Sequence, residues 1–252
     1  MIDFTAGASP RRLARMAGAL YLVNIVAGAF SIGVVPAILN GHNTAITAHN
    51  IQTHELLYRL GLAAHLVVTV TNIPMALLFF ELFKVVNRRL ALLDVFFSLV
   101  ATSVEAASIL NQFTPVVLLG SSRYTSAFPP AQLHALVYLP GDLAAINYSI
   151  YTVFYGLDFV VVAYLVFKST FLPRTIGVLL AIDALTYVVN GFTTMLAPGV
   201  AAHLGAWVGI PTIVAEGSFC LWLLVAGVNV ERWKERASEA IRMRAAQVEE
   251  LA

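Results

Sequence analysis

SLVATSVEAASILNQ (residues 98–112) is a largely apolar stretch that carries an ionisable group, Glu105, at its middle. It lies within a longer apolar run, residues 90–119, which as a helix is long enough to cross the hydrocarbon core of a bilayer. A charged side chain that faced lipid at this depth would cost at least about 2.5–3.5 kcal/mol. The stretch therefore predicts a transmembrane helix that turns Glu105 toward other helices.

The whole chain has the composition of an integral membrane protein. Of its 252 residues, 59 % are hydrophobic and 12 % are charged, whereas soluble domains carry about 25 % charged residues. The net charge of +1 comes with no basic face that interleaves aromatic residues. We therefore expect the lipid bilayer, and no nucleic acid, as a partner. Cys220 is the single cysteine, which excludes an intramolecular disulfide and a multi-thiolate metal site.

The apolar runs predict an all-α, polytopic membrane fold with six transmembrane helices, short outer helical segments and a C-terminal cytosolic helix. We expect residues 1–230 to form the six-helix bundle and residues 231–252 to form an amphipathic cytosolic tail. Asn43 or Thr44 is expected to cap an outer helix. A second short helix, residues 131–139, is expected to end at a break at Pro140-Gly141. The predicted spans are residues 13–39, 61–83, 90–119, 143–167, 176–196 and 208–228.

The distribution of Lys and Arg predicts the orientation of these spans. Of the 15 Lys and Arg residues, all but Arg59 and Arg123 fall at the two termini or in the connections between spans two and three and between spans four and five. Cytoplasmic loops carry the excess of Lys and Arg in membrane proteins. Both termini are therefore predicted to lie in the cytoplasm.

Each predicted span carries polar residues at positions four, seven and eleven apart. Residues with this spacing return to nearly the same face of a helix, so they form one polar edge. We expect these edges to turn inward and to line a cavity that binds a ligand. No Lys or Arg lies at this depth, so the buried acids must be protonated, hydrated or bound to something positive. The alternative is that they only hydrogen-bond neighbouring helices together. The predicted ligand-binding residues are His65, Asn72, Glu105, Tyr151, Asp158, Asp183 and Glu216.

Several stretches resemble a bacterial membrane-protein family catalogued as domain of unknown function 4386. They are RRLARMAGALYLVNIVAGAF (residues 11–30), NTAITAHNIQTHELLYRLGLAAHL (residues 43–66), FYGLDFVVVAYLVFKSTFLPRTIGVLL (residues 154–180) and EGSFCLWLLVAGV (residues 216–228). The resemblance implies a multi-pass protein of the bacterial inner membrane and implies no activity. The chain departs from the family at VVPAILNGHNTA (residues 34–45), where an Arg and an acid are often found.

The function that these features favour is binding or transport of a small amphipathic or cationic molecule in a cavity lined by carboxylates. One alternative is an intramembrane enzyme in which Glu105 or Asp158 acts as a general base with His65. Another is a structural or regulatory subunit that contacts a partner protein through its tail or through a lipid-facing groove. The chain is also compatible with a homo-oligomer. The sequence identifies no cofactor. A metal site is not expected, because His49 and His54 would point about 140° apart on one helix.

Overall fold

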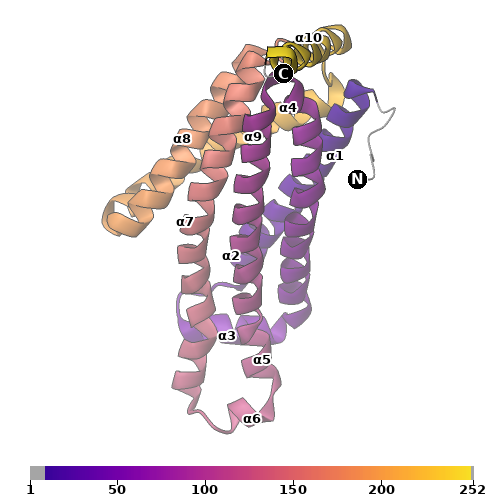
Figure 1. Cartoon of the computed structure of the whole chain (residues 1–252). Coiled ribbons are helices and arrows are strands. Elements are labelled where there is room, and N and C mark those ends of the chain that lie inside the picture. The colour runs from indigo at the N-terminus through magenta and orange to yellow at the C-terminus, as the bar shows by residue number, and fades with distance from the viewer. Residues whose placement is uncertain (1–8, 251–252) are drawn as a thin grey trace.

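In the computed structural model, which describes residues 9–250, the chain is 90 % helix and the described part contains no strand. The parts of the predicted bundle and tail at residues 1–8 and 251–252 lie outside the described residues. Figure 1 shows long helices side by side, with short helices at one end and α10 across the other. We name these the α3 end and the α10 end. The elements are α1 (Pro10–Gly28), the π-helix η1 (Ala29–Val34), α2 (Val35–Leu39), α3 (Thr44–Thr53), α4 (Glu55–Gln112), α5 (Thr114–Gly120), α6 (Ser122–Thr125), α7 (Pro130–Lys168), α8 (Arg174–Leu196), α9 (Pro198–Val225) and α10 (Val230–Glu250).

The described helices have the length and composition of a membrane protein. Four of them are long and apolar enough to cross a bilayer: Pro10–Leu39, Glu55–Gly120, Pro130–Lys168 and Arg174–Leu196. A fifth is added if the bent pair Gly209–Val225 and Val230–Met243 counts as one span. The expected all-helical, membrane-type fold is therefore confirmed at this level.

Helix α4 is two antiparallel helices joined at a sharp turn. The backbone of Asn87 is extended (φ −156°, ψ 107°) inside an otherwise helical stretch. The Asn87 side chain caps the second half, because its Oδ1 accepts a hydrogen bond from the Leu90 amide at 3.1 Å. The two halves contact each other far from the turn, where the Tyr58 hydroxyl donates to the Gln112 carbonyl at 2.6 Å, and again at His65 and Glu105, 3.0 Å apart. Predicted spans two and three thus form a helical hairpin.

The α3 end is built from short helices capped as the sequence suggests. Asn43 caps α3, since its Oδ1 accepts from the Ile46 amide at 2.9 Å. Buried apolar residues of α3, α5 and α7 pack together below it, among them Ile51, Leu118 and Val137. This packing holds α3 across the ends of the long helices, where it closes one side of a pocket.

The expected break at Pro140-Gly141 is wrong, because α7 runs continuously from Pro130 to Lys168 with Pro140 inside it. Proline fixes φ near −65°, which a helix accepts, although the Leu136 carbonyl loses its usual amide partner. In an apolar environment, ending the helix would leave several backbone groups unpaired instead of one. A single long helix is the less costly solution, and it carries residues 131–139 and the predicted fourth span together.

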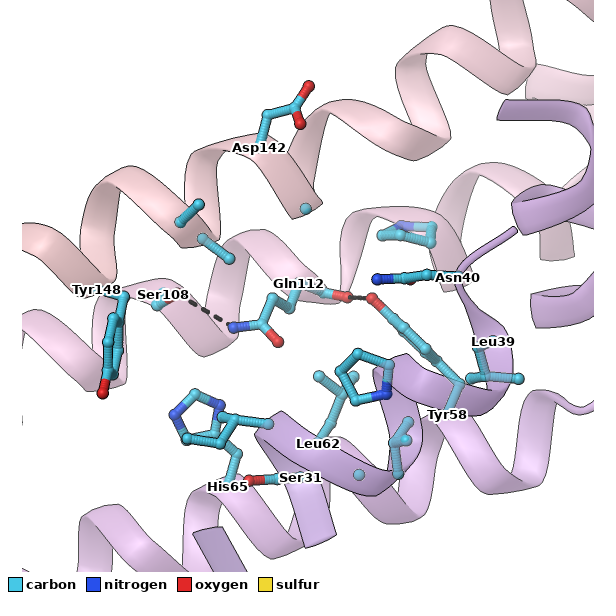
Figure 2. A pocket seen from close by; sticks show the side chains of 18 of the residues that line it. Ser31, Leu39, Asn40, Tyr58, Leu62, His65, Ser108, Gln112, Asp142 and Tyr148 are labelled. Atoms are coloured by element: carbon cyan, nitrogen blue, oxygen red, sulfur yellow. Dashed lines mark hydrogen bonds between the residues drawn. The ribbon is translucent and has the colours of Figure 1, made fainter. Parts of the chain in front are cut away.

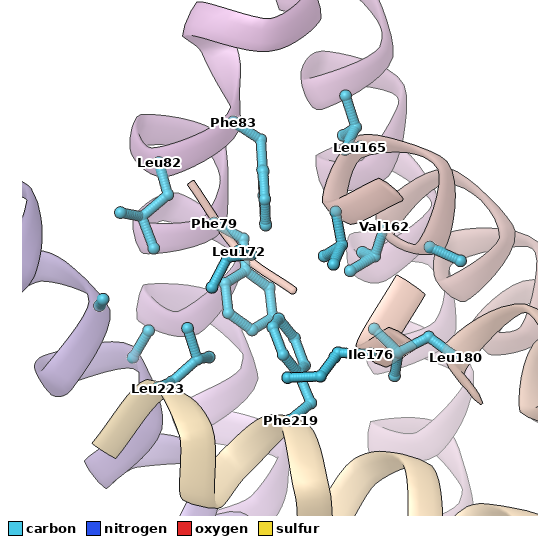
Figure 3. Packing of buried hydrophobic residues seen from close by; sticks show 14 of the residues in the cluster. Phe79, Leu82, Phe83, Val162, Leu165, Leu172, Ile176, Leu180, Phe219 and Leu223 are labelled. Carbon is cyan, nitrogen blue, oxygen red and sulfur yellow. The ribbon is translucent and has the colours of Figure 1, made fainter. Parts of the chain in front are cut away.

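The α10 end holds the main hydrophobic core. Phe79 and Phe219 pack with their ring centroids 5.6 Å apart, and Leu82, Leu180 and Leu223 around them are fully buried (Figure 3). The chain then turns by 96° between α9 and α10. Gly227 permits this turn with a φ of +68°, a conformation that residues with a Cβ rarely adopt. Helix α10 is held across the bundle by the Trp233 indole, which donates to the Leu82 carbonyl at 3.0 Å.

Candidate functional site

A pocket of about 560 Å³ opens between the long helices at the α3 end (Figure 2). Its walls come from η1 and α2, from α3, from both halves of α4, from the first residues of α5 and from the middle of α7. Gly61 lets α2 approach α4 closely, since a Cβ at this position would lie 3.0 Å from a methyl group of Val35. The volume is within the range of about 300–1,000 Å³ that small-molecule sites occupy.

A chain of hydrogen bonds forms the polar inner wall of the pocket. His65 Nε2 lies 3.0 Å from Glu105 Oε1, which joins the two halves of α4. The Asn72 amide donates to Glu105 Oε2 at 3.5 Å, and the Asn24 amide of α1 donates to Asn72 Oδ1 at 2.7 Å. An ionised carboxylate only accepts hydrogen bonds. Asn72 supplies a donor to one oxygen of Glu105, and His65 lies within hydrogen-bond distance of the other.

Aromatic rings form another part of the lining. Tyr148 and Tyr151 of α7 are stacked with centroids 5.8 Å apart, and both line the pocket. Tyr58 and Tyr138 line it from α4 and from the earlier part of α7. Aromatic faces attract cations through the quadrupole of the ring. The pocket thus combines tyrosine rings with carboxylates.

The charged groups around the pocket are acidic. Glu105 and Asp142 both line it, and none of its lining residues within the described chain is Lys or Arg. Sequence reasoning missed Asp142 and Tyr148. The signal for Asp142 is a carboxylate that directly follows Pro140-Gly141. This dipeptide predicts a helix break, whereas in the structure α7 continues through it and carries Asp142 in the wall of the pocket.

The structure brings three of the seven predicted ligand-binding residues together at the pocket and places the others elsewhere. His65, Glu105 and Tyr151 line the pocket, and Asn72 lies behind Glu105. Asp183 accepts a hydrogen bond from the Thr212 hydroxyl at 2.7 Å, between α8 and α9. Asp158, Asp183 and Glu216 do not line this cavity. The seven residues therefore do not share one hollow, and their role in ligand binding stays a prediction.

Glu216 lies at a junction of four helices and is surrounded by hydroxyl donors. Tyr21 of α1 and Tyr187 of α8 each donate to it at 2.7 Å, and Tyr155 of α7 donates at 3.3 Å. Tyr155 also stacks on Tyr151, with centroids 5.1 Å apart. Three donors satisfy a buried carboxylate that has no cation beside it. This cluster ties α1, α7, α8 and α9 together directly behind the aromatic wall of the pocket.

The described residues offer no obvious metal centre, because none of their groups of His, Cys, Asp and Glu has the three members needed to hold an ion. Fold and site together define a class of protein: an all-helical membrane protein with an acidic, tyrosine-lined pocket at one end of its bundle. The family profile of the domain of unknown function DUF4386 matches residues 16–227. The chain belongs to this family, which confirms the resemblance seen in its sequence. No curated protein and no solved structure matches the chain.

Proposed function

We propose that the protein binds a small amphipathic cation in the pocket at the α3 end, as a binding or transport-like protein. The observation that carries the proposal is a cavity of about 560 Å³ that two carboxylates and four tyrosines line without any Lys or Arg among the described residues. Carboxylates attract a cation by charge, and aromatic rings attract it at their faces. The apolar side chains of η1, α2 and α3 would contact the apolar part of the molecule.

The proposal also includes a six-span topology in the bacterial inner membrane, with the α10 end in the cytoplasm. The hairpin at Asn87 supports it, because α4 and α5 together are long enough for two crossings. Arg15, Lys84, Lys168 and Arg174 all belong to the α10 end, as the rule for cytoplasmic loops requires. A reporter fused after residue 252 that fluoresces only in the cytoplasm is expected to fluoresce, and a silent but full-length fusion would contradict this orientation.

The binding test uses a matched pair of probes. Benzyltrimethylammonium carries a quaternary ammonium group, and 2,2-dimethylpropylbenzene has the same shape without charge. We expect the cation alone to raise the thermal stability of the purified full-length protein in detergent, because a ligand that binds only the native state stabilises it. Equal stabilisation by both probes, or by neither, would argue against a cation site.

The residue test compares two variants that each remove one negative charge. Glu105→Gln is expected to weaken binding of the ammonium probe about tenfold or more, which is at least about 1.4 kcal/mol. Glu239→Gln, on the exposed side of α10, is expected to leave it unchanged. Both variants keep the shape of the side chain. An unchanged affinity in the Glu105 variant would remove this carboxylate from the site.

A second candidate function has one specific observation in its favour, the 3.0 Å contact between His65 and Glu105. This distance lies within the range of about 2.6–3.2 Å over which a carboxylate and an imidazole exchange or orient a proton. An enzyme with this pair as general base would convert a molecule held in the pocket. Lipid extract incubated with the wild type and with His65→Gln, compared by mass spectrometry, tests it: a product that only the wild type forms supports the enzyme, and identical spectra contradict it.

A further inference from the structure

Asp94 and Asp158 form a second acidic site, separate from the pocket. Asp94 lies on the second half of α4 and Asp158 on α7, and their side chains are only 2 % and 5 % exposed. Asp94 follows the turn at Asn87 by two helical turns, which places it about 10 Å inside the α10 end. The pair therefore lies between that end and the pocket.

The two carboxyl groups are neighbours, and no hydrogen bond from a described side chain to either of them is found. Their side chains are within hydrogen-bonding reach of each other. Asp94 Oδ1 and Asp158 Oδ1 are both buried and have no hydrogen-bond partner among the described residues. Glu105 and Glu216, in contrast, are each contacted by polar side chains that can donate to them. The aspartate pair is the buried acidic group that the surrounding side chains leave without donors.

Two ionised carboxylates cannot satisfy each other, because each can only accept a hydrogen bond. A protonated carboxyl group donates one, so a single proton held between the two groups supplies the missing donor and removes the repulsion between like charges. We propose that Asp94 and Asp158 are a proton-binding site in which the two carboxyl groups share one proton. Unlike a structural hydrogen bond, this arrangement binds an ion that can be exchanged.

The surrounding ionisable groups leave the pair without a fixed counter-charge. Neither aspartate takes part in any ion pair found among the described residues. Tyr151, which lies on α7 with Asp158 and lines the pocket, is a titratable neighbour on the pocket side. Ionisable groups elsewhere on the helices around the pair include Arg11, Arg12 and Arg15 on α1, His65, Glu81, Lys84, Arg88, Arg89 and Glu105 on α4, Asp142 and Lys168 on α7, Arg174 and Asp183 on α8, Glu216 on α9, and Arg236 on α10.

The position of the pair gives the proton a structural consequence. Asp94 lies on α4, which also carries Glu105, and Asp158 lies on α7, which also carries Tyr151. The pair is therefore on the two helices that carry these residues at the wall of the pocket. Loss of the shared proton would place two like charges together in a water-poor environment and would push these helices apart at the α10 side of the pocket. Coupling of this opening to a bound molecule rests on the proposed function, whereas the proton site does not.

The first test measures protonation in the unmodified full-length protein at neutral pH. Dicyclohexylcarbodiimide adds to a protonated carboxyl group in an apolar site and leaves a stable N-acylurea, with no leaving group. We expect mass spectrometry of peptides to find the adduct at Asp94 or Asp158, and we expect labelling to decrease as the pH rises. Infrared spectroscopy is expected to show the carbonyl stretch of a protonated carboxylic acid. This measurement tests protonation of the pair even if the carbodiimide does not reach it.

Variants assign the signal to the pair. In Asp94→Asn or Asp158→Asn the new amide donates to the remaining carboxylate, so both variants should fold while losing the infrared band and the adduct. Asp183→Asn, on α8, is the matched control and should keep both. A folded wild type that has neither the band nor the adduct overturns the proposal. Weaker carbodiimide labelling of the pair in sodium than in potassium buffer would also overturn the proposal, because the site would then bind a metal cation.

Discussion

Replacing Gly18 by alanine is expected to separate α1 from α9. A Cβ on Gly18 would lie 2.7 Å from the Leu224 amide nitrogen and 3.0 Å from its Cα. These are backbone atoms, so they cannot rotate away as the end of a side chain could. Restoring the 3.4 Å of ordinary contact requires a shift of about 0.7 Å between the helices, and a gap of about 0.5–1 Å already forfeits a quarter to a half of the dispersion attraction across it.

The expected cost follows from two opposing effects. Overpacking of this kind costs about 1–3 kcal/mol, and alanine returns about 0.5–1 kcal/mol relative to glycine within a helix. At the midpoints of these two ranges the net loss is about 1.3 kcal/mol, which corresponds to a decrease of about 2.5–5 °C in melting temperature for a chain of this size. Gly217→Ala in α9 is the control, because no atom outside the neighbouring backbone of its own helix lies within 4 Å of its Cβ position. The control is therefore expected to stabilise the protein.

Cys220 provides the assay. It is the single cysteine, it is 1 % exposed, and its Sγ lies 3.5 Å from the Gly18 carbonyl, so it reports on the α1–α9 contact itself. A fluorogenic thiol reagent should label it on heating at a lower temperature in Gly18→Ala than in the wild type, and at an equal or higher temperature in Gly217→Ala. Labelling of Gly18→Ala at or above the wild-type temperature would refute the argument from close packing.

The same assay tests three further contacts. Tyr21→Phe, which removes a 2.7 Å hydrogen bond to Glu216, is expected to cost about 1.5–3 kcal/mol, the range for bonds to charged groups. Tyr155→Phe should cost less, because its bond to the same carboxylate is 3.3 Å long, and equal costs would contradict this ranking. Trp233→Phe removes the donor to the Leu82 carbonyl and is expected to cost about 0.5–1.5 kcal/mol, with earlier exposure of Cys220 than in the wild type; an unchanged labelling temperature would show that α10 is held by other contacts.

Much of the secondary structure could be predicted from the sequence, because its signals are local. Asn43 caps α3 as expected, and the charged connection after residue 83 marks the turn at which Asn87 becomes extended. Pro140 shows where local reasoning fails. The residue removes a hydrogen bond in any environment, but whether the helix ends there depends on what would satisfy the neighbouring backbone groups, and the sequence does not carry that information.

The candidate site was predictable only in part. Helical periodicity placed Glu105 and His65 on inward edges of neighbouring spans, with His65 expected nearer the outer side, and the structure brings them to 3.0 Å. Helical periodicity gave no reason to connect Glu216 with three tyrosines from α1, α7 and α8, or Asp158 with Asp94. A polar edge defines a direction around one helix and a depth along it, but it does not define which helix lies opposite.

The sequence by itself determined the class of the protein, because apolar runs of this length favour helices that satisfy their backbone hydrogen bonds within a bilayer. It also predicted that Glu105, Asp158, Asp183 and Glu216 turn toward other helices. Only the tertiary structure decided how they are grouped: Glu105 at a pocket, Glu216 among tyrosine hydroxyls, and Asp94 against Asp158. The physical reason is that the hydrophobic requirement acts on each helix separately, whereas the neighbours of a buried carboxylate depend on how several helices pack at once.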